Sequence, residues 1–133
     1  MPQANPNAPP PPLRNVVAML HDASVSRAAA FYALLGFEVA NTHHEPGRDD
    51  EPVWAWLQSR NGASLMVAQA DEPVDPAAQS VLLYLYCDDV AAMHAALLVS
   101  GVQAGDITYP FYCPRGEFRT TDPDGYVVMV THT

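Results

Sequence analysis

The sequence contains no lysine, and this absence leaves the chain strongly acidic. Its six basic residues are all arginines and stand against 15 aspartates and glutamates, so the net charge is −9 at pH 7 with neutral histidines. A surface of this sign repels phosphate backbones and anionic lipid headgroups. We therefore expect no nucleic acid and no membrane as a partner, and cationic or neutral small molecules remain open as ligands.

Cysteine is scarce, and several functional motifs are missing. Cys87 and Cys113 are too few for a disulfide scaffold or a zinc site built from cysteines, so we predict two reduced packing residues in a cytoplasmic protein. No apolar run approaches the ~20 residues that span a bilayer. The N-terminus lacks the basic and apolar regions of a signal peptide. A glycine-rich phosphate loop and a Gly-x-Ser-x-Gly nucleophile motif are also absent.

Apolar residues are plentiful enough to form a core. The 133 residues are 49% hydrophobic and 16% charged, which fits one folded domain. Six of the 13 prolines lie in residues 1–12, where their fixed φ and missing N–H exclude a helix or a central strand. We predict a disordered, proline-rich tail over residues 1–12. A docking peptide for a partner protein is the alternative reading of the tail.

The first half of the chain shows strand and helix patterns in a definite order. They predict a strand, a helix and three strands over residues 13–20, 26–35, 37–41, 53–59 and 64–69. Asp22 or Ser24 is the expected N-cap of the helix, and Gly36 is its expected end. Asn61-Gly62 predicts a hairpin between the last two strands.

The same order then returns in the second half. It predicts a strand, a helix and three short strands over residues 81–87, 90–100, 102–104, 117–121 and 126–131. Asp88 and Asp89 are expected to cap the helix, and Gly101 to end it. The chain is thus an internal repeat of about sixty residues per copy. We predict modules over residues 13–70 and 80–133, joined by a linker over residues 71–79.

Three segments resemble a known superfamily in the right order and spacing. They are AMLHDASVSRAAAFYALLGFEV at 18–39, YCDDVAAMHAALLVSGV at 86–102 and EFRTTDPDGYVVMV at 117–130. The chain resembles the vicinal oxygen chelate superfamily, which includes glyoxalase I, extradiol dioxygenases, fosfomycin-resistance enzymes and bleomycin-resistance proteins. The resemblance implies an α+β fold in which two βαβββ modules form a curved eight-stranded mixed sheet around a cleft. It also implies a homodimer.

The resemblance also locates four strand positions that hold a divalent ion in metal-dependent members. Carried over one at a time, they fall on Asn15, Met66, Leu82 and Met129. Leucine cannot coordinate, methionine sulfur is soft, and asparagine offers one neutral carbonyl, whereas such an ion needs charged or imidazole ligands. We therefore expect no metal and no cofactor at this site. The cluster His43-His44-Glu45 is expected to bind metal only adventitiously.

Side chains alternate between the two faces of a strand, so these positions identify the residues that face the cleft. The expected ligand-binding set is Met19, Trp54, Trp56, Met66, Tyr84, Tyr86 and Met129, with Tyr109, Tyr112 and Arg119 as further contacts. Aromatic and methionine side chains suit a planar or greasy ligand, and tryptophan faces suit a cation. Packing in the core or in a dimer contact is the alternative for each residue. Glu117 is a weak candidate for a general base, and a solvated ion pair between Glu117 and Arg119 is its alternative.

Three hypotheses about function follow. The first is a metal-free protein of the bleomycin-resistance type that sequesters an aromatic, cationic or neutral ligand. The second is a glyoxalase- or dioxygenase-like enzyme, a lyase or isomerase, with a non-standard site at Glu117 or a relocated metal. The third is an interaction module that presents the proline-rich tail. Whether the protein is an enzyme stays open, with sequestration the preferred reading.

Overall fold

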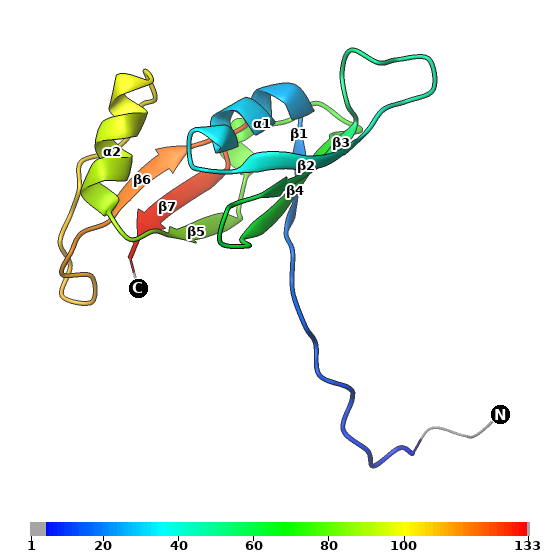
Figure 1. The fold of residues 1–133 in the computed structure, drawn as a ribbon, viewed down its shortest axis with the longest axis horizontal. Coiled ribbons are helices and arrows are strands. Elements are labelled where there is room, and N and C mark those ends of the chain that lie inside the picture. Colours follow the sequence, from blue (N-terminus) through cyan, green and yellow to red (C-terminus); the bar gives the residue numbers. More distant parts are fainter. Residues whose placement is uncertain (1–4, 133) are drawn as a thin grey trace.

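The fold consists of two mixed sheets, one from each half of the chain, in a computed structural model that describes residues 5–132 (Figure 1). The first half forms β1 (Met19–Asp22), α1 (Val25–Ala33), β2 (Glu38–His43), β3 (Trp54–Gln58) and β4 (Ser64–Gln69). The second half forms β5 (Leu82–Tyr86), α2 (Val90–Val99), β6 (Phe118–Thr121) and β7 (Val127–Thr131), after a short 3₁₀ helix, η1 (Pro76–Ala78). The strand orders are β1-β4-β3-β2 and β5-β7-β6. This arrangement confirms the α+β fold class and the repeated plan.

Local capping explains where the two helices begin and end. The Ser24 hydroxyl accepts a hydrogen bond from the backbone N–H of Arg27 at 3.1 Å, and the Asp89 carboxylate accepts one from Ala92 at 2.9 Å. These bonds satisfy N–H groups that a first helical turn leaves unpaired. Gly36 and Gly101 follow the helices with φ of +97° and +82°. Ser24, and not Asp22, is therefore the N-cap of α1, and Asp22 has another role.

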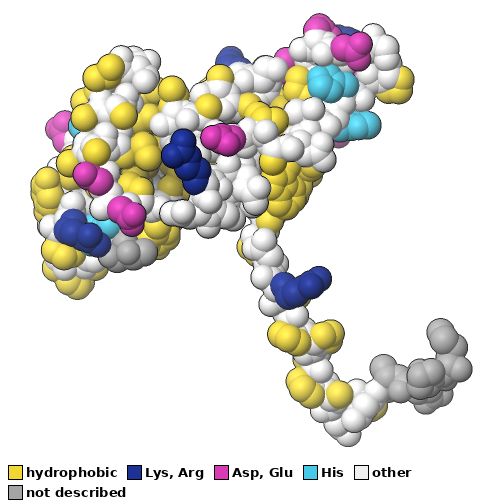
Figure 2. Space-filling view, in the orientation of Figure 1, with side chains coloured by type: hydrophobic (Ala, Val, Ile, Leu, Met, Phe, Trp, Pro, Cys, Tyr) yellow, Lys and Arg dark blue, Asp and Glu magenta, His cyan; other side chains and the backbone are white. Residues whose placement is uncertain are grey.

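The first strand is shorter than predicted and begins later. The sequence pattern placed it over residues 13–20, but β1 starts at Met19. Just before it, the Ala18 carbonyl accepts a hydrogen bond from the Met66 N–H at 2.9 Å. Because β4 begins at Ser64 and Met19 pairs with Met66, a strand that started before Val17 would extend beyond the first residue of β4. Residues 5–16 form an arm that stands clear of the body (Figures 1 and 2). The rest of the predicted tail, residues 1–4, lies outside the described residues.

The predicted eight-stranded sheet is also corrected. Within residues 5–132 the sheets have four and three strands, and the expected strand over residues 102–104 is reduced to isolated bridges. Ala104 bridges to Thr120, and Thr108 bridges to Glu117. Between these two bridges the chain advances by four residues on one side and by three residues on the other. One extra residue therefore interrupts the ladder, as a β-bulge does. The sequence pattern shows the apolar residues of this segment but not the interruption.

One hydrophobic core runs through both modules. Its largest fully buried side chains include Tyr32, Phe118, Leu20, Leu57 and Leu97, which come from both halves of the chain. The two halves therefore contribute to a single shared core. Both cysteines are free. No helix within residues 5–132 has the length and apolar character needed to cross a bilayer.

The turn before β7 depends on a glycine that the linker packs against. Gly125 has a φ of +91°, and a Cβ atom added there would lie 2.4 Å from the backbone oxygen of Pro76 in η1. Gly101 has a similar positive φ, but an added Cβ would meet nothing within 4 Å. The two glycines thus share a backbone conformation and differ in their surroundings.

We predict that Gly125→Ala destabilises the fold more than Gly101→Ala does. The positive φ alone costs about 1–2 kcal/mol for an alanine, and at Gly125 the collision with backbone atoms of Pro76 adds to it. We expect a loss of about 1 kcal/mol for Gly101→Ala and about 2–4 kcal/mol for Gly125→Ala in urea unfolding. Equal losses would show that η1 does not restrain this turn.

Candidate functional site

The first sheet presents a row of large apolar side chains on the face away from α1. Across the strands, Trp56 pairs with Met66, which pairs with Met19, and Trp54 pairs with Ala68. These side chains are partly exposed, whereas the alternate residues are buried on the other face of the sheet: Leu20, Ala55, Leu57, Leu65 and Val67. The pleat therefore separates a core face from a face that no helix covers.

The second sheet repeats this separation. Tyr84 pairs with Met129, which pairs with Arg119, and Tyr86 pairs with Thr131. Tyr84 and Tyr86 are 47% and 63% exposed, while Val128 and Val130 are buried. We call the uncovered residues of both sheets the aromatic face: Met19, Trp54, Trp56, Met66, Tyr84, Tyr86 and Met129. Their binding role stays a prediction.

Glu117 is an acidic residue directly before β6, the strand whose Arg119 pairs with Met129 of this face. It precedes Phe118, is 5% exposed, and its Oε1 accepts a hydrogen bond from the Tyr112 hydroxyl at 3.1 Å. This hydrogen bond and the charge of Glu117 raise the pKa of Tyr112. The burial contradicts the solvated ion pair with Arg119 that the sequence also allowed. Glu117 is thus a buried carboxyl group that accepts a hydrogen bond from an exposed phenol.

An exposed aromatic loop leads into Glu117. Tyr109 and Tyr112 are 66% and 63% exposed, and Phe111, which sequence reasoning missed, is 96% exposed. Phe111 and Tyr112 meet edge to face with ring centroids 5.4 Å apart. Cys113 is buried and anchors the loop through contacts of its sulfur with Thr131 Oγ1 at 3.0 Å and the Gly116 carbonyl at 3.2 Å. Cys113 is thus a packing residue here.

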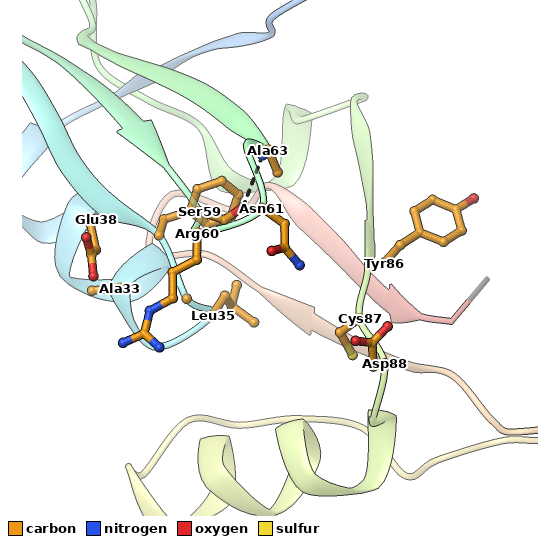
Figure 3. A pocket seen from close by; sticks show the side chains of 12 residues that line it. Ala33, Leu35, Glu38, Ser59, Arg60, Asn61, Ala63, Tyr86, Cys87 and Asp88 are labelled. Carbon is orange, nitrogen blue, oxygen red and sulfur yellow. Dashed lines mark hydrogen bonds between the residues drawn. The ribbon is translucent and has the colours of Figure 1, made fainter.

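A cavity between the two modules was not anticipated from the sequence. It has a volume of about 580 Å³ and is lined by Leu35, Arg60 and Asn61 from one module and by Cys87 and Asp88 from the other (Figure 3). A narrower apolar cavity of about 230 Å³ shares Leu35 and Cys87 with it and reaches Tyr84 and Tyr86. Burial raises the pKa of the Cys87 thiol. These two cavities contact the aromatic face only at Tyr84 and Tyr86. Trp54, Trp56 and Met66 line neither of them.

The register of the strands corrects one of the four superfamily metal positions. Met19 pairs with Met66 as Tyr84 pairs with Met129, so the residue equivalent to Leu82 in the first module is Val17. Asn15, the residue expected from the sequence, is exposed and lies ahead of β1. The position is misassigned by two residues because the helix N-cap is Ser24 and not Asp22.

The corrected set is a poor match for a divalent ion. Val17 and Leu82 have no donor atoms, and Met66 and Met129 offer only soft thioether sulfur. Within residues 5–132, no group of three or more histidine, cysteine, aspartate or glutamate side chains is placed to hold a metal. The residues present do not fit the ion that metal-dependent members bind at these positions.

Comparisons with known proteins agree with this architecture. Residues 16–130 match the family profile described as the Glyoxalase/Bleomycin resistance protein/Dioxygenase superfamily. No curated protein matches the sequence. Similar solved structures include a bleomycin-binding protein in complex with bleomycin, with 22% identity, a TM-score of 0.70, and 91% of this chain and 99% of that chain covered.

Two further solved structures are similar to the same extent. A bleomycin resistance determinant encoded on the transposon Tn5 has 22% identity and a TM-score of 0.71, with 91% of this chain and 98% of that chain covered. An antibiotic-binding protein from Streptomyces sp. CB03234 has 22% identity and a TM-score of 0.70, with 90% and 96% covered. At this identity the likeness establishes the fold.

We predict that the protein retains no stoichiometric metal ion, because the strand positions lack hard ligands. The test is incubation with Mn²⁺, Fe²⁺, Ni²⁺ or Zn²⁺, desalting, and elemental analysis. Any weak retention is expected to disappear in His43→Ala/His44→Ala, since those two histidines form the loop cluster with ligand chemistry. One ion per chain that survives this double substitution would contradict the assignment.

Proposed function

The chain belongs to the glyoxalase/bleomycin resistance protein/dioxygenase superfamily, and from this premise we propose that it sequesters a small aromatic molecule without metal chemistry. Superfamily membership and the bleomycin-binding neighbours support a small-molecule-binding role. The observation that carries the finer proposal is the row Trp56–Met66–Met19. In this row the thioether of Met66 stands at a position where metal-dependent members carry a hard ligand, and an aromatic ring and a second thioether flank it.

The chemistry of the aromatic face favours a flat ligand that carries positive charge. Trp56 and Tyr84 offer ring faces for stacking, which contributes about 0.5–1.5 kcal/mol per pair beyond area burial. Tryptophan rings also attract cations. Glu117 lies buried at the edge of the second sheet's part of this face, and the net charge of −9 draws cations toward the chain. An aromatic cation therefore satisfies more of these groups than a neutral or anionic aromatic does.

A second copy of the chain is the proposed cover of the aromatic face. Tyr84, Tyr86 and Leu82 are each 46–63% exposed on β5, an edge strand of its sheet. Contiguous exposed apolar side chains and an unpaired strand edge are features that association hides. A two-fold dimer would close the face and enclose the ligand between copies. The homodimer is part of the proposal.

Catalysis is the second candidate function, and the burial of Glu117 favours it. A carboxylate that is 5% exposed and beside a phenol can serve as a general base toward a bound carbon acid. Such an enzyme would act as a lyase or an isomerase. Mass spectrometry of a ligand recovered after prolonged incubation separates the two functions, because sequestration returns it unchanged.

We predict that Trp56→Ala weakens binding of two probes, metal-free bleomycin and a planar acridinium dye, by about 10- to 100-fold. This range corresponds to the loss of about 1.5–3 kcal/mol from burial and stacking of one aromatic ring. Binding is measured by calorimetry. Leu98→Ala, on the outer side of α2 where the residue is 50% exposed, is the matched control and should bind as the parent does. Equal affinities for both variants would move the site away from the aromatic face.

We predict that Glu117→Gln selectively weakens binding of the cationic dye. Loss of a charged hydrogen-bond partner costs about 1.5–3 kcal/mol, so we expect the dye to bind about tenfold or more weakly and its neutral analogue to be unaffected. Glu72→Gln removes an exposed carboxylate instead and serves as the control for net charge. If both glutamine variants weaken the dye equally, the general acidic field and not Glu117 recognises the cation.

A further inference from the structure

The two modules are joined at a polar junction where the turn over residues 122–125 meets β1 and α1. The backbone N–H of Ala23 donates to Asp124 Oδ2 at 2.8 Å, and Arg27 forms an ion pair with Asp124 Oδ1 at 2.8 Å. The Tyr32 hydroxyl donates to Asp122 Oδ2 at 2.9 Å. These contacts link residues about a hundred positions apart in the chain, so the junction fixes one module on the other.

The turn itself uses the remaining carboxylate oxygen. Asp122 Oδ1 accepts hydrogen bonds from the backbone N–H groups of Asp124 at 2.8 Å and Tyr126 at 3.0 Å. All four oxygens of Asp122 and Asp124 therefore accept from donors, as ionised carboxylates do. Both residues are 4% exposed. Arg27 supplies one positive charge against these two negative charges.

Asp22 is the third carboxyl group at this junction, and it is the anomalous one. It is 0% exposed, and neither of its oxygens accepts a hydrogen bond from any of the described residues. The next residue in the chain, Ala23, donates to Asp124, and Asp22 interacts electrostatically with the carboxyl groups of Asp122 and Asp124, which offer acceptors and no donors. An ionised Asp22 would thus add a buried charge without a partner, whereas a protonated Asp22 donates to one of the two carboxylates.

We propose that Asp22 is protonated at neutral pH and donates a carboxyl–carboxylate hydrogen bond to the turn, so that the junction between the modules is a proton-dependent latch. Titratable and charged groups surround Asp22 on several elements. The turn contributes Asp122 and Asp124, followed by Tyr126, and α1 contributes Tyr32 and Arg27. His21 is the neighbour of Asp22 on β1, and its side chain lies on the opposite face of the strand. Arg27 is the cation among them, and it is already paired with Asp124.

The electrostatics of the junction agree with this assignment. Burial, followed by the charge of Asp122 and the hydrogen bond with Asp124, raises the pKa of Asp22 to about 8 from its usual 3.8. Burial and the charge of Asp122 also raise the pKa of Tyr32, so the phenol remains a donor. Losing the Asp22 proton replaces a hydrogen bond with repulsion among three carboxylates.

The direction of the pH dependence follows from proton binding. Between pH about 4 and about 8 the folded chain holds the Asp22 proton, whereas the unfolded chain has released it. Stability therefore decreases as the pH rises through this range and levels off above it. The latch is closed at acidic and neutral pH and opens at alkaline pH.

The test compares the wild type with Asp22→Asn across pH 5 to pH 9.5. The amide has the shape of a protonated carboxyl and donates without ionising. We expect the melting temperature of Asp22→Asn relative to wild type to increase from pH 5 to about pH 8 and then to stay constant. Asp106→Asn makes the same exchange at an exposed residue and should follow the wild type at every pH. A constant difference between Asp22→Asn and wild type would overturn the proposal.

A direct measurement on the wild type keeps the test decisive even if Asp22→Asn does not fold. Carbon-13 NMR of labelled aspartates follows each carboxyl carbon as the pH changes. The proposal requires the carboxyl carbon of Asp22 to titrate near pH 8. Asp22 titrating near its usual 3.8 would overturn it. Stabilisation by Ca²⁺ or Mg²⁺ that removes the pH dependence would also overturn it, because the group would then hold a cation.

Discussion

Within residues 5–132 each module has one α-helix to cover its sheet, and much of the architecture follows from this constraint. A βαβββ module can bury the helix-side face of its sheet, where side chains such as those of Leu57 and Val67 are fully buried. The other face is left uncovered. Burying apolar area stabilises a fold by about 25 cal/mol per Å², so two small modules gain by sharing one core. The uncovered faces then remain available for a ligand or a second copy.

Joining the modules requires a contact that fixes the position of one module relative to the other. The turn over residues 122–125 provides this contact. Gly125 packs against Pro76 of the linker helix η1, and Asp122 and Asp124 hold β1 and α1 through hydrogen bonds with defined donors. Because hydrogen bonds are directional, they specify the placement of the modules more sharply than apolar packing does. A chain with 15 acidic residues and no lysine cannot supply many cations for such a junction. On our proposal, a proton held between two carboxyl groups reduces the negative charge of the junction in place of a further cation.

Much of the fold was predictable from local chemistry. Periodicity identified both helices and most strands, Gly36 and Gly101 marked the helix ends, and Asn61-Gly62 marked the hairpin. Alternation along strands also placed the aromatic side chains on the face away from the helices. The strand expected over residues 102–104, the second of the second module, was predicted wrongly because a bulge depends on pairing with Thr120 and Glu117, which are distant in sequence. How early β1 can begin is likewise limited by its partner β4, whose first residue is Ser64.

Some properties of the site residues can likewise be predicted from the local sequence, whereas others depend on contacts between residues that are distant in the sequence. Trp54 and Trp56 are found by alternation, whereas the burial of Glu117 comes from a loop that folds back through Tyr112. The cavity beside Cys87 exists only where two modules meet. Asp22 did carry a signal, since its position two residues after the buried Leu20 placed it on the core side of β1. It was interpreted as a candidate cap, because an aspartate before a helix is more often a cap than a buried acid.

The aromatic face and the junction solve one electrostatic problem in opposite ways. The junction gathers three carboxyl groups away from water and neutralises them with Arg27 and, on our proposal, a proton. The aromatic face instead has no carboxyl, guanidinium or imidazole group among its seven residues, and Glu117 and Arg119 lie at its margin. An ionic group at the centre would lose more solvation than a single contact restores. Contact affinity for an aromatic cation then rests on rings and thioethers, while the acidic surface contributes attraction at longer range.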